Sequence, residues 1–557
     1  MNAELKSLAD EYWEFSLDWD PTAAHMMGDY SRIGEVERAD RASEDQAIAH
    51  MRDIALRARA IQPETLSSSD LATLETLLYQ VDTQSAVLET RQAEFGLDPI
   101  FGPQASFHVT IPQLTIENSD HAEAMLTKYT NLGRLFDEST DRLREGVASG
   151  RVSARFAVES VVEQVDEWLA TPLDEDTLLT AQLPSSMTED ERQAWEDQVK
   201  VIITDTVRPA LKRYRDYIAT DIAPIARPNE QAGLFGLADG DLVYSRLLEH
   251  YTTFPMQAAE IHQIGLQQVD RLKTEYRTYG PEALGTDNLD EIFTILRTDE
   301  SITHTSGEDI VAVCEAAFER ARAEMGNWFG RLPESDCKVQ ETKHGAIAYY
   351  FEPAEDGSRP GTFFMNTADP TAWGHAEVEG TAFHEGIPGH HLQIAIAQEM
   401  GDALPTFRRN EFISAYGEGW ALYTERLSNE MGLYSGPLEL VGMLQGDSMR
   451  ACRLVVDTGM HALGWSRQQG IDYMWNNSPM SMQQIVGEID RYLSFPGQAV
   501  SYMIGRIEIE RMRTEAETAL GDQFDIKGFH DAVLGSGSVP LDSLDRIVKE
   551  WVATVQG

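Results

Sequence analysis

The octapeptide HEGIPGHH, residues 384–391, carries the strongest chemical signal in the chain. It contains, within eight positions, His384, Glu385, His390 and His391. A zinc hydrolase needs this combination, because neutral imidazoles hold the metal and a neighbouring carboxylate takes a proton from water. Ligand, acid and base types grouped so densely favour a metal site over histidines that cap a helix or fill a core. The fold is therefore expected to be built around this segment.

The spacing of these histidines differs from that of the common H-E-x-x-H helix. On a straight helix His390 would lie roughly 9 Å along the axis from His384 and about 120° round, and His391 roughly 10.5 Å away. Neither could then share an ion with His384. Pro388 has no N–H group and its ring crowds the carbonyl of His384, so a break in the helix is expected. We predict His384 and His390 as metal ligands, with His391 as the alternative to His390.

A third metal ligand is expected from a helix shortly downstream. Residues 410–427, NEFISAYGEGWALYTERL, offer three glutamates on one helical face, seven positions apart. Glu418 is the predicted ligand because it begins an apolar helical run. Glu411 is the second choice, and Glu425 fits a carboxylate that faces solvent.

Residues 449–465 form a helix with ionisable groups along one face, at positions that step by three or four. Arg450 or Arg453 would bind a substrate carboxylate, and His461 would donate a hydrogen bond to the transition state. The alternative is that Arg453 and Asp457 form an ordinary ion pair one turn apart.

Tyr502 lies on a further helix, after the loop Pro496–Gln498, and is a candidate donor to a developing oxyanion. A buried core tyrosine explains the same pattern.

A small antiparallel sheet is predicted just before the HEGIPGHH segment, from residues 338–340, 346–351 and 362–366. The turn signal DGSRPG, residues 356–361, separates the last two of these segments. An exposed edge strand could pair with an extended substrate, although a sheet that only packs is the alternative. Asn366, on the last strand, is a candidate for holding substrate backbone.

Composition excludes several classes of function. The 557 residues include 45 Lys and Arg against 92 Asp and Glu, a formal net charge of −47. Such a surface repels nucleic acids and anionic lipids, so neither is an expected partner. Three cysteines are too few for a disulfide framework or a cysteine-based metal site. The first residues do not resemble a signal peptide and no apolar run is long enough to span a membrane, so a cytoplasmic location is expected.

Helical periodicity covers most of the chain. We therefore predict a mainly α protein, with a mostly helical half over residues 1–335 and a catalytic half over residues 336–557, forming one continuous unit. The clearest helical segments are 43–61, 70–92, 120–148, 154–170, 188–220, 256–278, 308–328, 437–463 and 499–519.

Four motifs occur in an order that resembles a known family: HEGIPGHHLQ, YGEGWALYTERL, RLVVDTGMHALGW and FPGQAVSYMIGR. The chain is similar, over nearly its whole length, to a bacterial domain-of-unknown-function family of the gluzincin metallopeptidase clan. The resemblance implies two helical halves around a deep cleft, as in thimet-type oligopeptidases and angiotensin-converting enzyme. It also implies zinc ligands at His384, His390 and Glu418 and a general base at Glu385. The two extra residues after Glu385, compared with the clan's HE-x-GH, leave His391 open as a ligand.

The sequence thus predicts a zinc-dependent hydrolase, most simply a metallopeptidase acting on short peptides. A hydrolase of a non-peptide amide or ester, and a binding protein that keeps the fold without catalysis, are the alternatives. Intact Glu385 argues against the second of these.

Overall fold

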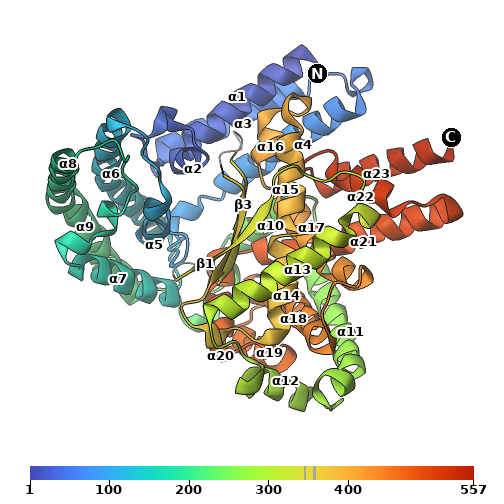
Figure 1. Ribbon diagram of the computed structural model, residues 1–557. Coiled ribbons are helices and arrows are strands. Elements are labelled where there is room, and N and C mark those ends of the chain that lie inside the picture. Colours follow the sequence, from blue (N-terminus) through green and yellow to red (C-terminus); the bar gives the residue numbers. More distant parts are fainter. Residues whose placement is uncertain (344–346, 355–358) are drawn as a thin grey trace.

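The computed structural model describes residues 1–343, 347–354 and 359–557. Within these ranges the protein is mainly helical with a small sheet near its centre, as predicted from the sequence (Figure 1). The first helices lie at the top of Figure 1, the following ones at its left, and the last ones at its right.

The helices of the predicted first half are long and joined by short 3-10 turns. Their bounds are α1 (Ala3–Trp19), α2 (Pro21–Met26), α3 (Arg41–Ala58), α4 (Ser68–Leu88), α5 (Pro103–Thr110), α6 (Ser119–Ser149), α7 (Arg155–Ala170), α8 (Glu189–Ile202), α9 (Arg208–Tyr217), α10 (Gly240–Thr252), α11 (Ala258–Leu284), α12 (Leu289–Thr298) and α13 (Gly307–Trp328).

The sheet and the remaining helices follow. Their bounds are β1 (Cys337–Thr342), β2 (Ala348–Phe351), β3 (Gly361–Asn366), α14 (His375–Glu385), α15 (His390–Glu399), α16 (Thr406–Asn410), α17 (Ser414–Glu430), α18 (Pro437–His461), α19 (Arg467–Asn477), α20 (Met482–Ser494), α21 (Ser501–Leu520), α22 (Ile526–Leu534) and α23 (Leu541–Gln556).

Each of the nine predicted helical segments coincides with observed helix. The segment 188–220 covers α8, a short π-helical stretch (Ile203–Val207) and α9. The division of the chain at residue 335 stays a prediction. One hydrophobic cluster nevertheless contains residues from both sides of it, among them Tyr276 and Leu454.

The sheet is mixed, which corrects the predicted antiparallel arrangement. β3 lies between the other two strands, pairing antiparallel with β2 and parallel with β1. Consecutive strands usually pair, but here β3 inserts between β1 and β2 and so separates them. Ala346 and residues 356–358, parts of the predicted strand and turn, lie outside the described residues.

The central strand is held by the helices on either side of it in sequence. Phe363 and Met365 of β3 are completely buried, in a cluster with Phe318 of α13 and Val378 of α14. This packing fixes α14, whose last residues are His384 and Glu385, against the sheet.

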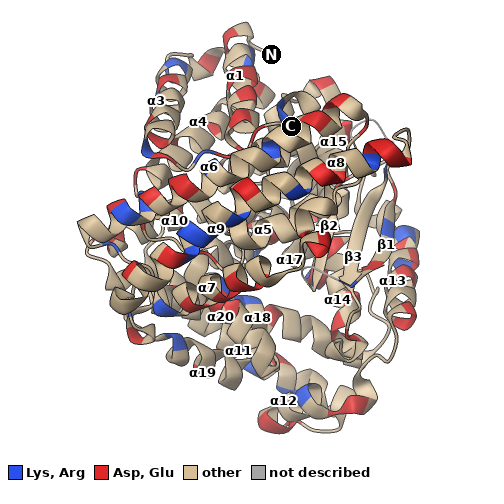
Figure 2. Ribbon diagram, turned by 90° about the vertical axis from the view of Figure 1, so that its left-hand side faces the viewer, with Lys and Arg blue, Asp and Glu red and all other residues tan. Residues whose placement is uncertain are grey.

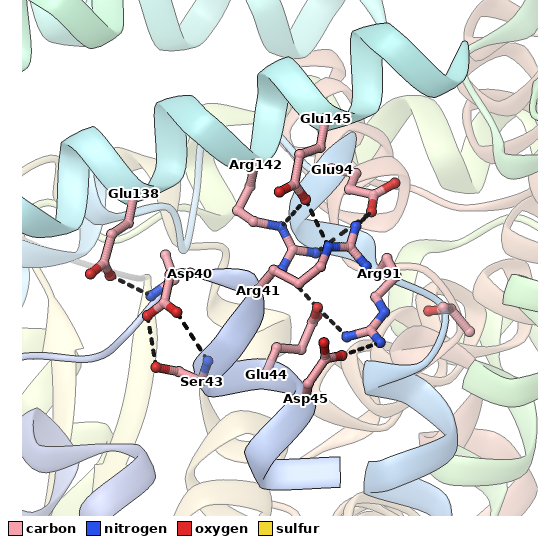
Figure 3. Close-up of polar contacts among 12 residues, drawn as sticks. Asp40, Arg41, Ser43, Glu44, Asp45, Arg91, Glu94, Glu138, Arg142 and Glu145 are labelled. Carbon is pink, nitrogen blue, oxygen red and sulfur yellow. Dashed lines mark hydrogen bonds and ion pairs between the residues drawn. The ribbon is translucent and has the colours of Figure 1, made fainter. Parts of the chain in front are cut away.

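A buried network of ion pairs joins α3 to α6 (Figure 3). The Arg142 guanidinium of α6 is 1% exposed and lies 2.7 Å from Glu44 of α3 and 3.3 Å from Glu145. Glu44 also accepts a hydrogen bond from Arg91, at 2.6 Å. Each buried charge therefore has an opposite charge in contact with it, as burial requires.

Acidic residues are spread along helices in all parts of the view in Figure 2 and do not gather on one element. Among the described residues no helix is both long and apolar enough to cross a bilayer.

We predict that Arg142→Met lowers the free energy of unfolding by about 3 kcal/mol, because it leaves Glu44 and Glu94 buried with fewer compensating charges. Arg144→Met is the matched control on the same helix, since the Arg144 side chain is 55% exposed and pairs with exposed Asp141. Its effect is expected to stay within about 0.5 kcal/mol. Urea denaturation followed by circular dichroism measures both, and equal effects would contradict the proposed role of the network.

Candidate metal centre

The helix predicted to break at Pro388 does break there. α14 ends at Glu385 and α15 begins at His390. The chain passes so closely over itself that a Cβ atom on Gly389 would lie 1.9 Å from the carbonyl oxygen of His384. A side chain at position 389 is therefore excluded, and the tight passage returns His390 to the side of His384.

His384, His390 and Glu418 converge on one point. Glu418 Oε2 lies 3.5 Å from His384 Nε2 and 3.4 Å from His390 Nε2. The two imidazole rings are nearly perpendicular, with centroids 5.0 Å apart. All three side chains are more than four-fifths buried. Three elements, α14, α15 and α17, thus each supply one potential ligand atom to the same small volume.

These separations fit a tetrahedral metal site better than a hydrogen-bonded cluster. Ligands about 2.0–2.1 Å from a zinc ion at tetrahedral angles are about 3.3 Å apart. Good N–H···O hydrogen bonds are shorter, at about 2.9 Å. Among the residues that the structure describes, Glu418 Oε2 is also buried without a hydrogen-bond partner. Burying a charged carboxylate oxygen without a partner is costly, so this position favours a bound cation.

The electrostatics of the site favour positive charge between the imidazoles. Burial alone would lower the pKa of His384, but the neighbouring carboxylates of Glu418 and Glu425 outweigh it and raise that pKa to about 9. Burial would conversely raise the pKa of Glu418, yet the adjacent imidazoles of His384 and His390 hold it well below its usual range. A metal cation bound here replaces a proton, so its affinity is expected to rise with pH.

Glu425 has a role that the sequence analysis missed. It was interpreted as a solvent-facing carboxylate, but it is 2% exposed and Glu425 Oε1 lies 2.8 Å from His384 Nδ1. A carboxylate on the far nitrogen fixes the tautomer and the ring orientation of a metal-binding histidine. Its position, two helical turns after Glu418 on the same face, was the signal that could have revealed it.

The two alternative ligands point elsewhere. His391 Nδ1 lies 2.9 Å from the Tyr350 hydroxyl and its Nε2 lies 3.0 Å from the carbonyl oxygen of Ser335. Glu411 accepts hydrogen bonds from Ser16 and from Gln80, on α1 and α4. Both side chains therefore make hydrogen bonds elsewhere and do not reach the point where His384, His390 and Glu418 meet.

A cavity of about 800 Å³ opens beside the three candidate ligands. Glu385 and Tyr502 both line it, as the predicted roles in catalysis require. The Tyr502 ring lies nearly parallel to that of His384, with centroids 6.4 Å apart. Burial raises the pKa of Tyr502, so its hydroxyl keeps its proton and can act as a donor.

Arg450 and Arg453 also line the cavity but differ in their partners. Arg453 donates to the Tyr492 hydroxyl and to Glu488, both at 2.8 Å, and its guanidinium lies over the Tyr502 ring. Arg450 donates a long hydrogen bond of 3.3 Å to the carbonyl of Gly446 and lies 3.6 Å from Glu425. Within the described residues, Nε of Arg450 and Nη1 of Arg453 are both buried without a hydrogen-bond partner. Arg450 is held by the longer contacts and is therefore the freer of the two to bind a ligand.

His461, the predicted transition-state donor, lies outside the cavity. It is completely buried, its Nδ1 accepts a hydrogen bond from Leu234 N–H, and its Nε2 lies 3.0 Å from the carbonyl oxygen of Tyr492. The part of α18 that lines the cavity ends at Arg453. His461 lies eight residues later, about 12 Å farther along the helix.

Asn366 is likewise displaced from the site. It lies on β3, the central strand, and its side-chain oxygen accepts a hydrogen bond from Ala368 N–H. It is not one of the residues that line the cavity. The sheet lies beside the cavity, as predicted, but the strand that carries Asn366 does not line it. The sequence did not reveal this, because it did not reveal the strand order.

The strand that does line the cavity is β2. Ala348, Tyr349 and Tyr350 line the cavity, and among the described residues β2 pairs with β3 on one side only. The free side of an edge strand presents N–H and C=O groups that an extended chain can pair with. The aromatic run at residues 349–351 predicted a strand here but gave no indication of its edge position.

Close contact between α17 and α21 sets Glu418 opposite Tyr502. A Cβ atom on Gly419 would lie 2.5 Å from the carbonyl carbon of Gly505, and one on Gly505 would lie 1.9 Å from the carbonyl oxygen of Ala415. The two backbones therefore touch, which only glycine allows.

Comparisons with known proteins agree with this fold. A family model described as "Bacterial protein of unknown function (DUF885)" matches residues 21–548. Among solved structures, a candidate lipoprotein from Colwellia psychrerythraea is 23% identical with a TM-score of 0.91, and the match covers 99% of each chain. A candidate lipoprotein of unknown function from Shewanella oneidensis is 18% identical with a TM-score of 0.74, over 97% of this chain and 99% of that one. No curated protein matches. At these identities the structural likeness establishes the fold alone.

The choice between the two adjacent histidines can be tested directly. We predict that His390→Ala lowers zinc affinity at least about 100-fold, whereas His391→Ala keeps the metal but destabilises the protein by about 1–3 kcal/mol, because the Tyr350 hydroxyl and the Ser335 carbonyl lose a partner. Metal analysis of the two purified variants, with denaturation curves for each, measures this. Metal retained by the His390 variant and lost by the His391 variant would reverse the assignment.

Proposed function

The chain belongs to the DUF885 family, and we propose that it is a zinc-dependent hydrolase of the gluzincin type that cleaves short peptides. The observation that carries the proposal is the meeting of His384, His390 and Glu418 at tetrahedral separations beside Glu385, in one cavity. A metal of the zinc class suits two imidazoles and one carboxylate.

The donor set fits the metal that the proposal requires. His384, His390 and Glu418 would hold the zinc ion, and Glu425 would orient His384 from behind. Three protein ligands leave one position open, which is typical of catalytic rather than structural zinc. Zinc bound here would supply a Lewis acid and lower the pKa of a coordinated water.

Glu385 is the proposed general base. It follows His384 directly and lines the same cavity as the three candidate ligands. It would take the proton from the attacking water and pass it to the leaving nitrogen, which is the usual double role of such a residue.

Tyr502 is the proposed donor to the oxygen of the carbonyl under attack. Its ring is held between His384 and the Arg453 guanidinium, whose carbon lies 4.4 Å from the ring centroid. This double contact fixes the direction of the hydroxyl. With His461 and Asn366 outside the cavity, Tyr502 is the remaining predicted residue suited to this step.

The shape of the site supports a short, extended substrate. The cavity volume of about 800 Å³ is within the range of pockets that bind small molecules. The edge of β2 would pair with the substrate backbone, in place of the predicted contact to Asn366. The deep cleft between two helical halves, which the family resemblance implied, would admit only short or unfolded chains.

Arg450 is the proposed site for the substrate's terminal carboxylate. Its guanidinium lines the cavity and is held by longer contacts than that of Arg453, which donates to Glu488 at 2.8 Å. A charge-assisted hydrogen bond at this position would favour substrates with a free carboxyl end.

A hydrolase of non-peptide amides or esters is the second candidate function, because it would use the same residues. Parallel assays with a peptide library and with small amide and ester panels separate the two. For location, the cytoplasm remains the prediction from sequence. The description of both structural neighbours as candidate lipoproteins supports the cell envelope as the alternative.

The general-base proposal predicts that Glu385→Gln lowers kcat by about 10²–10⁴-fold while the zinc content stays unchanged. The loss follows because an amide cannot accept the proton. Hydrolysis of a fluorogenic peptide library, with metal analysis of the same samples, measures it. Glu430→Gln, an exposed position on α17 paired with Arg513, is the control and should keep full activity. Full turnover by a metal-loaded Glu385 variant would refute the mechanism.

The substrate proposal predicts that the enzyme prefers peptides with a free carboxyl end over their amidated forms by about 10–100-fold in kcat/KM, the value of one or two charged hydrogen bonds. Arg450→Gln should remove this preference, chiefly through KM. Arg467→Gln, which disrupts an ion pair with Asp490 away from the cavity, should keep it. An unchanged preference in the Arg450 variant would contradict the assignment.

A further inference from the structure

A second group of metal-ligand side chains lies at the opposite end of α14 from His384. It consists of His304, Asp309 and His375. His375 is the first residue of α14, Asp309 lies in the first turn of α13, and His304 lies in the segment just before α13. None of these residues lines the cavity described above.

The backbone around this group is fixed by pairing. Thr303 and Gly374 form an isolated antiparallel bridge, and His304 N–H donates to the carbonyl oxygen of Trp373 at 2.9 Å. His304 and His375 are thus held on neighbouring chain segments. Their ring centroids are only 4.1 Å apart.

His304 is oriented in the same way as His384. Asp309 Oδ2 lies 2.7 Å from His304 Nδ1, as Glu425 lies against His384 Nδ1. This contact leaves Nε2 of His304 as the lone-pair donor. The His304 side chain is completely buried, and its Nε2 has no hydrogen-bond partner in the part of the chain that the structure describes. Buried polar atoms normally have a bonding partner, so an unpartnered imidazole nitrogen here points to a ligand such as a metal ion.

The three side chains bring one candidate ligand atom each to within 4.8 Å of one another. Ligand atoms on a tetrahedral zinc ion are about 3.3 Å apart, so the side chains would have to draw closer together to bind one. Asp309 lies against Nδ1 of His304, on the other side of the ring from Nε2, and therefore orients the imidazole rather than adding a third ligand. Its carboxylate also offsets the positive end of α14, which by itself disfavours a cation.

We propose that His304, Asp309 and His375 form a second site for a divalent metal of the zinc class. His304 Nε2 and His375 are the imidazole ligands, and Asp309 orients His304 and supplies the negative charge. Bound metal ties the segment before α13 to the start of α14. The inference does not depend on the proposed hydrolase activity, because it uses none of the same residues.

Counting zinc equivalents in the full-length protein tests this site separately from the first. Metal is removed with a chelator, and the protein is titrated with Zn²⁺ against a chromophoric chelator. Wild-type protein should bind two equivalents. The double variant His384→Ala/Glu418→Gln, which lacks two ligands of the first site, should bind one.

Further changes in that double variant identify the remaining ligands. Adding His375→Ala should lower the remaining zinc affinity at least about 100-fold, and adding Asp309→Asn should lower it about 10–100-fold. Adding His50→Ala, a partly exposed histidine 3.8 Å from Glu11, should change nothing. Zn²⁺ should also raise the thermal midpoint of the double variant, and His375→Ala should abolish that rise.

The proposal fails if the double variant binds no zinc, or if its zinc equivalent survives His375→Ala with unchanged affinity. His375 is preferred to His304 for these tests because it is only partly buried. Circular dichroism of each variant confirms that the fold is intact before the titration.

Discussion

The contact on which the candidate site depends is that of Glu418 Oε2 with two imidazole nitrogens, at 3.4 and 3.5 Å. A carboxylate oxygen enclosed in this way has lost its water and gained no good hydrogen bond, which is costly unless positive charge lies between the groups. The surrounding structure is arranged to keep that charge in place. Glu425 adds a second carboxylate behind His384, and the break before α15 keeps His390 within reach.

Paired charges recur in the interior away from this point. Arg142 is enclosed by Glu44 and Glu145, and Arg453 by Glu488 and the Tyr492 hydroxyl. An arginine fork can satisfy several acceptors at once, so it suits buried positions between carboxylates. In a chain with a net charge of −47, buried arginines also reduce repulsion between acidic groups that folding brings together. The same pairing that holds α3 to α6 therefore also orders the wall of the cavity.

The mainly α fold could be predicted because helices follow from local sequence periodicity. The long periodic segments became helices such as α6 and α18, and the proline in HEGIPGHH marked the break correctly. The sequence could not show strand order, since inserting β3 between β1 and β2 depends on contacts with α13 and α14. This strand order places β2, and not Asn366, along the cavity. The position of His461 outside the cavity has a related cause: periodicity predicts which face of a helix a residue occupies, but the cavity covers only part of the length of α18. Glu425 was missed because burial depends on the neighbouring helices rather than on its own helix.

The glycine contact between α17 and α21 has a mechanical consequence. Helices whose backbones touch have no layer of side chains between them that could rearrange, so they resist sliding and rotation. Glu418 and Tyr502 are accordingly expected to keep their separation in thermal motion. A change in the width of the cavity would then come from other parts of its lining, among them β2. The geometry of the candidate site and the size of its opening can in this way be governed by different parts of the molecule.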